Sequence, residues 1–336
     1  MCRLVQRRGI IGLFCLLFVA SSVVPGWAQK DNRFEVSKNL DIFNSLLKEV
    51  EMFYVDSVDV DKTVQRGIEA MLAGLDPYTE YYPEQKTEEL SLMTTGEYGG
   101  IGSLIRQRNN EGGVMIAEPT EGMPADLAGL KPGDLILAID TIDVSKATNS
   151  RVSELLKGVP NTKMVLTIQR PGEKKPRKFE ITRKQITTPQ VTYYGVKNDS
   201  IGYIYLKAFT IKSAQEVKEA FLDLKKNHNI KSLVLDLRGN GGGVLEGAVQ
   251  IVGMFVPKGS EVLSTKGKIK QWDRTYRTST EPLDTVMPLA ILINGGTASA
   301  AEIVSGSLQD MDRAVLVGQR SFGKGLVQAP RDLSLI

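Results

Sequence analysis

Apolar positions recur at helical spacing near the start of the chain, from Val36 to about Leu92. Leucine, phenylalanine and valine side chains return every third or fourth residue, at Leu40, Phe43, Leu46, Leu47 and Val50. This period is typical of an amphipathic helix. The stretch TVQRGIEAMLAGL repeats it until Asp76-Pro77, where proline favours a stop. We therefore expect a helical segment over residues 29–95 that has a structural role and precedes the other domains.

Between residues 96 and 186 the pattern changes to short β-like runs interrupted by glycine. In chain order these are SLIRQ, VMIAEP, AGLKPGDLILAID, a helix candidate at Asn149–Lys157, and the alternating run MVLTIQR. The order resembles a PDZ domain, and Pro132-Gly133-Asp134 followed by apolar alternation is its most specific part. The resemblance implies a small β-barrel with helices.

The loop that opens this segment, YGGIG, resembles the PDZ loop whose backbone N–H groups capture a peptide's terminal carboxylate. Glycine allows a ligand to approach the backbone and leaves the amides unshielded. The expected peptide-binding residues are Tyr98, Gly99, Gly100, Ile101, Gly102 and Leu155. Of these, Ile101 and Leu155 would line the pocket for the last side chain.

From Thr192 onward, strand and helix patterns alternate. The runs IGYIYLKAF, SLVLDLRG and PLAILING read as strands, and SAQEVKEAFLDLKK and VLEGAVQIVGMF read as helices. This alternation predicts an α/β core with a largely parallel sheet over residues 187–336. The loops DLRGNGGG and NGGTAS would then follow the carboxyl ends of strands, where such folds usually carry their site.

Residues 1–28 have the pattern of a secretory signal peptide. A basic start with three arginines precedes the apolar stretch from Gly9 to Val24, and Gly26-Trp27-Ala28 offers a cleavage site. An uncleaved membrane anchor is the alternative, but the apolar run is short for a span of about 20 residues. Cys15 lies inside the apolar stretch after bulky Phe14, which argues against a lipoprotein. We expect export, and no stable membrane span after cleavage.

Composition excludes several kinds of chemistry. Both cysteines, Cys2 and Cys15, fall in the leader, so the mature chain would have no disulfide, thiol nucleophile or cysteine metal site. Loss of the three leader arginines lowers the formal charge from +3 to zero. A neutral protein offers no electrostatic argument for nucleic acid or an anionic membrane as partner.

The strongest chemical signal is a serine and a lysine near the end of the chain. Ser299 follows a Gly-Gly turn where an apolar strand meets a helix pattern, and Lys324 comes 25 residues later between two glycines. Serine needs a base to become a nucleophile, and the single histidine, His228, lies in a polar run. A neutral lysine amine among apolar neighbours would serve as that base. Gln328, four residues further on, would orient the amine if that segment were helical.

Ser299 also has a structural interpretation, as the cap of the helix that follows it. Ser299 and Glu302 have capping-box spacing, and Thr297 would cap equally well. Capping is compatible with catalysis, because the Ala300 amide at a helix start could stabilise an oxyanion. Ser305 and Ser307 lie further along this helix, where hydroxyls usually bond to the preceding turn.

Two motif-based alternatives fail. Ser321 and Lys324 have the S-x-x-K spacing of β-lactamases, but flanking glycines disfavour the helix that this motif needs, and S-D-N and K-T-G are missing. The run DLRGNGGG has neither the third glycine of a dinucleotide loop nor the Lys-Ser/Thr of a P-loop. It fits better as a turn that offers a second oxyanion amide, from Gly241 or Gly242.

Taken together, these motifs resemble the carboxyl-terminal processing proteases, also called tail-specific proteases. The resemblance includes YVDSVD, AMLAGLDPYTEYY, TTGEYGGIG, DLRGNGGG, NGGTASAAEI and SFGKGLVQ. It implies a core of the ClpP/crotonase type, with Ser299 as nucleophile, Lys324 as base and Gln328 beside the lysine. Relatives often have serine at the positions of Thr297 and Ala301, so the absence of serine at these two positions leaves Ser299 as the match.

The sequence therefore predicts an exported serine endopeptidase of the periplasm or the extracytoplasmic face of the inner membrane. It would bind protein or peptide substrates by their free C-terminal tails and need no metal or organic cofactor. A non-catalytic PDZ adaptor that only holds tails is the alternative. Family members usually continue well past the glutamine, whereas this chain stops at RDLSLI, so we expect a C-terminally truncated core. Whether the protein forms a homo-oligomer is left open.

Overall fold

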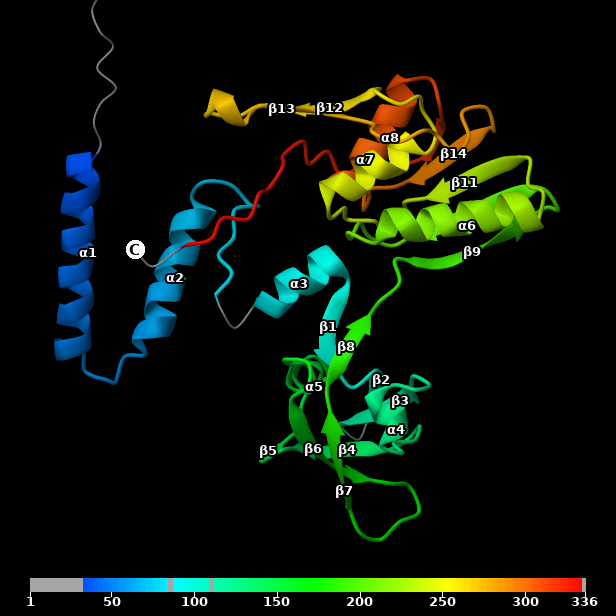
Figure 1. Ribbon diagram of the computed structural model, residues 1–336. Helices are drawn as coiled ribbons and strands as arrows, with labels where there is room; N and C mark the ends of the chain where they lie inside the picture. Colours follow the sequence, from blue (N-terminus) through cyan, green and yellow to red (C-terminus); the bar gives the residue numbers. More distant parts are fainter. Residues whose placement is uncertain (1–32, 84–86, 109–111, 334–336) are drawn as a thin grey trace, which may run out of the picture. The chain divides into compact units, whose positions relative to one another are not determined.

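The computed structural model describes residues 33–83, 87–108 and 112–333 (Figure 1). The expected leader, residues 1–28, lies outside these ranges. The chain divides into two compact units, Met1–Tyr81 and Tyr82–Ile336. No helix in the described ranges has the length and apolarity needed to cross a membrane.

The first unit contains two helices, α1 (Arg33–Phe53) and α2 (Val60–Ala73). The Asp59 carboxylate caps α2 by accepting from the Lys62 N–H at 3.1 Å. Beyond the end of α2, the Asp76 carboxylate accepts 2.7 Å bonds from the N–H groups of Tyr78 and Thr79. The helical character expected from the apolar period is confirmed, and Asp76 holds the turn after it.

The second unit begins with helix α3 (Thr87–Thr95) and strand β1 (Glu97–Gly100). Strand β1 pairs antiparallel with β8 (Lys184–Thr187), the last strand before the α/β core. Both ends of the glycine-rich domain therefore join in one short two-stranded ladder.

Between β1 and β8 lies a sheet in the order β2-β3-β4-β6-β7, with β5 attached to β4. Its strands are β2 (Ser103–Gln107), β3 (Val114–Pro119), β4 (Leu135–Ile139), β5 (Ile142–Asp143), β6 (Lys163–Gln169) and β7 (Arg177–Thr182). Helices α4 (Pro124–Leu127) and α5 (Asn149–Leu156) complete the domain. Asp134 of the PGD segment is fully buried and accepts bonds from Arg170 at 2.8 Å, an ion pair that fixes this turn.

The remaining part is an α/β core with a five-stranded sheet in the order β15-β14-β11-β10-β9 (Figure 1). Its strands are β9 (Val191–Lys197), β10 (Ile201–Leu206), β11 (Ser232–Asp236), β14 (Leu289–Ile293) and β15 (Val315–Gly318). Strands β10, β11, β14 and β15 are parallel, and β9 runs antiparallel at one edge. The expected strand and helix alternation is confirmed, apart from this edge strand.

Helices α6 (Ser213–Asn227), α7 (Leu245–Gly253) and α8 (Ala300–Asp310) share one apolar cluster with the sheet. Strand β10 shows the pattern: Ile204 and Leu206 are fully buried in the cluster, whereas the intervening tyrosines are only partly buried. Successive side chains of a strand point to opposite faces. The tyrosines therefore lie on the sheet face away from this cluster. A separate antiparallel hairpin, β12 (Glu261–Thr265) and β13 (Arg274–Arg277) with the short helix η2 (Lys270–Trp272), follows α7 and was not expected from the sequence.

Candidate active site

Ser299 lies at the sharp turn between β14 and α8, as the residue that precedes the helix. Its backbone has φ 55° and ψ −119°, an unusual conformation for a residue with a side chain. Such a conformation costs on the order of 1–3 kcal/mol and persists only where surrounding contacts hold it. A strained strand-to-helix turn of this kind is a conformation that exposes a serine side chain.

The contacts that hold this turn come from the loop after β11. The Asn294 Oδ1 atom accepts from the Gly239 N–H at 2.9 Å and from the Gly296 N–H at 3.0 Å. The Thr297 hydroxyl, fully buried, donates to the Leu237 carbonyl at 2.8 Å. Thr297 is thus a tie between the two loops, which excludes the alternative in which it caps α8.

Gly242 lies directly against the turn that carries Ser299. A Cβ atom there would come within 2.7 Å of the Ser299 Cβ and 2.9 Å of the Ala300 nitrogen, and the residue has φ +96°. Only glycine leaves room for a group bound at the Ala300 amide. The Gly242 N–H itself donates to the Asn240 side chain at 2.9 Å. Gly242 therefore contributes space rather than the expected oxyanion donor, and Ala300 and Gly241 remain as candidate donors.

Glu302 joins the serine turn to the lysine loop. Its carboxylate accepts from the Ser299 N–H at 2.8 Å and from the Lys324 N–H at 3.1 Å, through the same oxygen. Its other oxygen accepts from the Ser321 hydroxyl at 2.7 Å and the Gly323 N–H at 2.6 Å. Burial raises the pKa of Glu302, but these four hydrogen bonds outweigh burial and hold its pKa below the usual value. The carboxylate places the backbones of Ser299 and Lys324 side by side.

Lys324 lies in a segment without regular secondary structure that follows β15, and its Nζ donates to the Gln328 side-chain oxygen at 2.5 Å. The two side chains are together although this segment is not helical. Lys324 is only partly buried, and its apolar neighbours Phe322 and Leu326 are 57% and 53% exposed. The expectation of a buried lysine among apolar side chains is therefore wrong for this structure.

The other hydroxyls and the histidine lie in structural roles. The Ser305 hydroxyl donates to Ala301 at 2.9 Å, one turn back, as the sequence predicted. The Ser307 hydroxyl donates at 2.8 Å to Val262 in the neighbouring hairpin instead. His228 follows the carboxyl end of α6, 3.8 Å from Asp223. None of these contacts involves Ser299.

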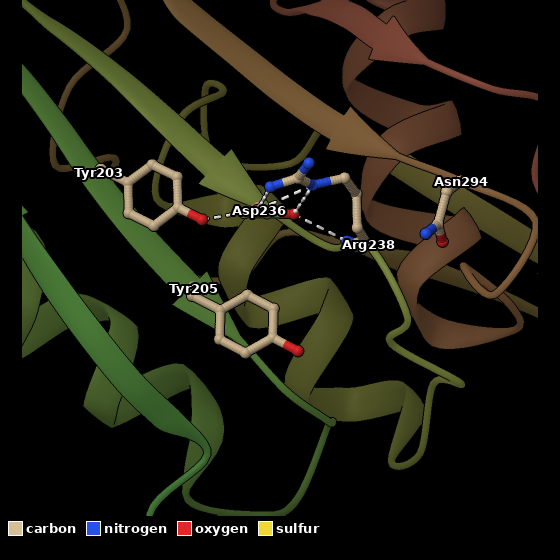
Figure 2. Close-up of a pocket in the computed structure, with 5 residues that line it drawn as sticks. All are labelled: Tyr203, Tyr205, Asp236, Arg238 and Asn294. Atoms are coloured by element: carbon tan, nitrogen blue, oxygen red, sulfur yellow. Dashed lines mark hydrogen bonds and ion pairs between the residues drawn. The ribbon is translucent and has the colours of Figure 1, made fainter.

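A polar cluster that the sequence did not single out lies at the end of β11. The Asp236 carboxylate, 2% exposed, accepts from Arg238 Nη2 and from the Tyr203 hydroxyl, both at 2.6 Å (Figure 2). Burial raises the pKa of Asp236, but the bonds from Arg238 and Tyr203 outweigh burial and hold the pKa below its usual value. The sequence signal was an acid and an arginine on either side of a strand end, but their pairing depends on the turn geometry.

The glycine-rich domain carries a groove between the YGGIG loop and helix α5. It is lined by Tyr98, Gly100, Ile101, Gly102, Ser103, Ile105, Ser153, Leu156 and Lys157. Leu156 replaces the expected Leu155, which packs on the domain core and accepts from Arg183 at 3.0 Å through its carbonyl. The error is one residue of helix register, which turns a side chain by about 100°.

Two further differences concern this groove. Gly99 does not line it, because its carbonyl accepts from the Gly158 N–H at 3.1 Å and a Cβ there would meet the Gly158 oxygen at 1.8 Å. Gly99 thus holds the loop against the end of α5. The sequence missed Lys157, whose Nζ lies 5.4 Å from the centre of the Tyr98 ring and brings a positive charge to the groove.

Comparisons with known proteins agree with this arrangement. The profile of Peptidase family S41 matches residues 200–335, and a PDZ domain profile matches residues 115–170. A carboxy-terminal-processing protease of Bartonella bacilliformis is 36% identical over 327 residues, which cover 96% of this chain and 74% of that protein. A probable CtpA-like serine protease of Staphylococcus aureus is 33% identical over 298 residues, covering 88% of this chain and 58% of its own length.

Among solved structures, a photosystem II D1 C-terminal processing protease is 31% identical. The match covers 86% of this chain and 78% of that one, with a TM-score of 0.45. A PDZ domain followed by an α/β core with a serine at a strained turn defines a PDZ-containing serine-type peptidase. The chain belongs to the carboxy-terminal-processing proteases of peptidase family S41.

Proposed function

We propose that the protein is an exported endopeptidase that captures the C-terminal tails of proteins and cleaves them with Ser299 and Lys324. The observation that carries the assignment is the Glu302 carboxylate, which binds the backbones of both residues at 2.8 and 3.1 Å. Two loops from different parts of the core are thereby held at one point, at the carboxyl edge of a sheet that we assign to the ClpP/crotonase type.

The reaction follows from the atoms at that point. The Ser299 Oγ attacks the scissile carbonyl carbon while neutral Lys324 takes its proton, and Gln328 orients the amine. The tetrahedral oxyanion receives hydrogen bonds from the Ala300 amide and a second donor that we assign to Gly241. Lys324 then protonates the leaving amine, and water hydrolyses the acyl-enzyme by the same route in reverse order.

Substrate selection belongs to the groove of the PDZ domain. The amides of the YGGIG loop would bind a terminal carboxylate, a known mode of peptide recognition. The Lys157 ammonium adds a favourable charge there. Capture of the tail raises the local concentration of the chain near Ser299.

A serine-directed acylating probe tests the assignment. We expect the wild type to be labelled at Ser299, and Ser299→Ala not to be labelled. Lys324→Ala and Lys324→Arg should each lower cleavage of a tailed peptide about 10³-fold or more. Alanine has no basic group, and the guanidinium of arginine stays protonated. All variants should still bind the tail.

Ser305→Ala is the matched control, because its hydroxyl bonds only within α8. An unlabelled wild type that binds tails would show that the protein is a non-catalytic adaptor. Near wild-type turnover by Lys324→Arg would remove Lys324 as the base. Export is tested separately, by sequencing the mature N-terminus of protein from a periplasmic fraction.

A further inference from the structure

A cavity of about 400 Å³ opens at the carboxyl ends of β10, β11 and β14 (Figure 2). It is lined by Tyr203, Tyr205, Asp236, Arg238 and Asn294. The tyrosines belong to the face of β10 opposite the buried Ile204 and Leu206, so the cavity lies on the sheet face away from the helical cluster. The proposed reaction uses none of the five side chains.

The groups around this cavity are mainly hydrogen-bond donors. Arg238 is 52% exposed and uses Nε and Nη2 to bind Asp236, which leaves the two donors of Nη1 outside that pair. The Tyr205 hydroxyl makes no hydrogen bond within the part of the chain that the structure describes. Asn294 accepts two backbone bonds through Oδ1, so its Nδ2 end is the one available to a ligand.

The charge of Arg238 does not make the cavity cationic. Asp236 accepts from Nε at 3.0 Å and from Nη2 at 2.6 Å, in a two-pronged pair that compensates the guanidinium charge locally. The Tyr203 hydroxyl bonds the same carboxylate at 2.6 Å, so Asp236 is held on both sides. A rigid, charge-compensated set of donors suits a neutral acceptor better than an anion. In a polypeptide, that acceptor is the backbone carbonyl.

The position of the cavity connects it to the nucleophile. Asn294 begins the loop that ends at Ser299, and Arg238 begins the loop that reaches Gly242. The Ala298 N–H donates to the Asn240 carbonyl at 2.9 Å, so the two loops run together from the cavity to the serine turn. The same two loops thus carry the cavity donors at one end and the serine turn at the other.

We propose that this cavity is a main-chain subsite, in which Arg238, Tyr205 and Asn294 donate hydrogen bonds to backbone carbonyls of the polypeptide substrate. The inference rests on the proposed peptidase function and extends it to how the chain is held. Such a subsite accepts a substrate whatever its side chain at that position, which suits an enzyme that selects its substrate by the C-terminal tail. Asp236 and Tyr203 act through Arg238 and are positioning residues.

The test uses the 336-residue chain and a series of tailed peptides lengthened one residue at a time on each side of the cleaved bond. In the wild type, KM should fall once the peptide is long enough to reach the cavity. Tyr205→Phe removes only the hydroxyl, and Arg238→Lys keeps a cation beside Asp236 but loses the outer donors. For peptides long enough to reach the cavity, KM in each variant should be about threefold to tenfold higher than in the wild type, as expected for the loss of a hydrogen bond to a neutral group.

The length series separates binding from a structural defect. Short peptides should show the same KM in the variants as in the wild type, whereas a distorted site would impair peptides of every length. Tyr194→Phe, a partly exposed tyrosine on the neighbouring strand β9, is the matched control and should leave the series unchanged. An unchanged fall in KM for both Tyr205→Phe and Arg238→Lys would overturn the subsite.

Peptides that differ only by Glu or Gln at the cavity position address the ligand chemistry. Equal KM values for the pair support backbone recognition, and a requirement for Glu would overturn it in favour of a carboxylate site. Labelling of wild-type Ser299 by the acylating probe keeps the two proposals apart. A labelled wild type with an unchanged length series refutes the subsite alone, whereas an unlabelled wild type refutes the peptidase assignment.

Discussion

At the scale of single residues, the turn that carries Ser299 depends on the small size of a neighbouring glycine as much as on reactive groups. Gly242 has φ +96°, and its missing side chain leaves space beside the Ala300 amide. Thr297 and Asn294 connect this turn to the loop after β11 through buried or backbone-directed bonds. The proposed nucleophile, Ser299, is therefore held by residues to which the proposed reaction assigns no step.

Gly242→Ala should strongly slow the acylation of Ser299. The added Cβ would lie 2.7 Å from the Ser299 Cβ and 2.9 Å from the Ala300 nitrogen, and it would be strained at this positive φ. We expect the rate of probe labelling to fall about 100-fold or more, comparable to the loss of an oxyanion donor.

Gly295→Ala is the matched control, because nothing lies within 4 Å of a Cβ built there and the residue precedes the same turn. It should be labelled at the wild-type rate. Equal labelling of both variants would show that the space at Gly242 has no role in acylation.

At the scale of elements, the PDZ groove is formed by one loop and one helix that touch at Gly99 and Gly158. The contact fixes the distance between the loop amides and Leu156 of α5. A tail bound there would find both the amides and Lys157 near its carboxylate.

Amidating the C-terminus of a tail peptide should lower its affinity about tenfold or more, because the charge-assisted bonds to the loop amides and Lys157 are lost. Fluorescence anisotropy with the Ser299→Ala chain measures this without cleavage. Acetylation of the peptide's N-terminus is the control and should change nothing. Equal binding of acid and amide would mean that the YGGIG loop does not read tails.

At the scale of the whole molecule, one acidic residue ties helix α6 to the segment that leads into β14. Asp284 precedes β14, accepts from Lys225 of α6 at 2.6 Å, and also accepts from the Val286 and Met287 N–H groups. Burial raises the pKa of Asp284, but these bonds outweigh it and lower the pKa from 3.8 to about 2.

A lowered folded-state pKa means that the stabilisation is complete above pH 4 and is lost as pH falls toward 2. Asp284→Asn should therefore unfold at lower urea than the wild type at pH 7, and the difference should shrink below pH 4. Glu281→Gln is the control, since its pair with Lys258 spans 3.6 Å between exposed side chains. A urea midpoint difference for Asp284→Asn that stays constant from pH 7 to pH 2.5 would contradict this linkage.

Much of the fold follows from local pattern. The period of three and four predicts α1 and α2, and alternating apolar runs predict β10, β11 and β14, because each element must bury one face. The sequence did not predict the antiparallel edge strand β9 or the β12–β13 hairpin. These strands are only partly buried, so their apolar pattern is weak.

The sequence by itself determined which chemistry this protein has available: a serine and a lysine at fixed spacing, no cysteine after Cys15, one histidine in a polar run, and a glycine-rich loop before a β-rich domain. These are properties of residue type and order. Only the tertiary structure decided that Glu302 joins the serine and lysine loops, that Leu156 rather than Leu155 lines the groove, and that Asp236 pairs with Arg238 beneath Tyr203. Those contacts depend on helix register and on loops brought together by parallel strands, and sequence spacing does not encode such distances.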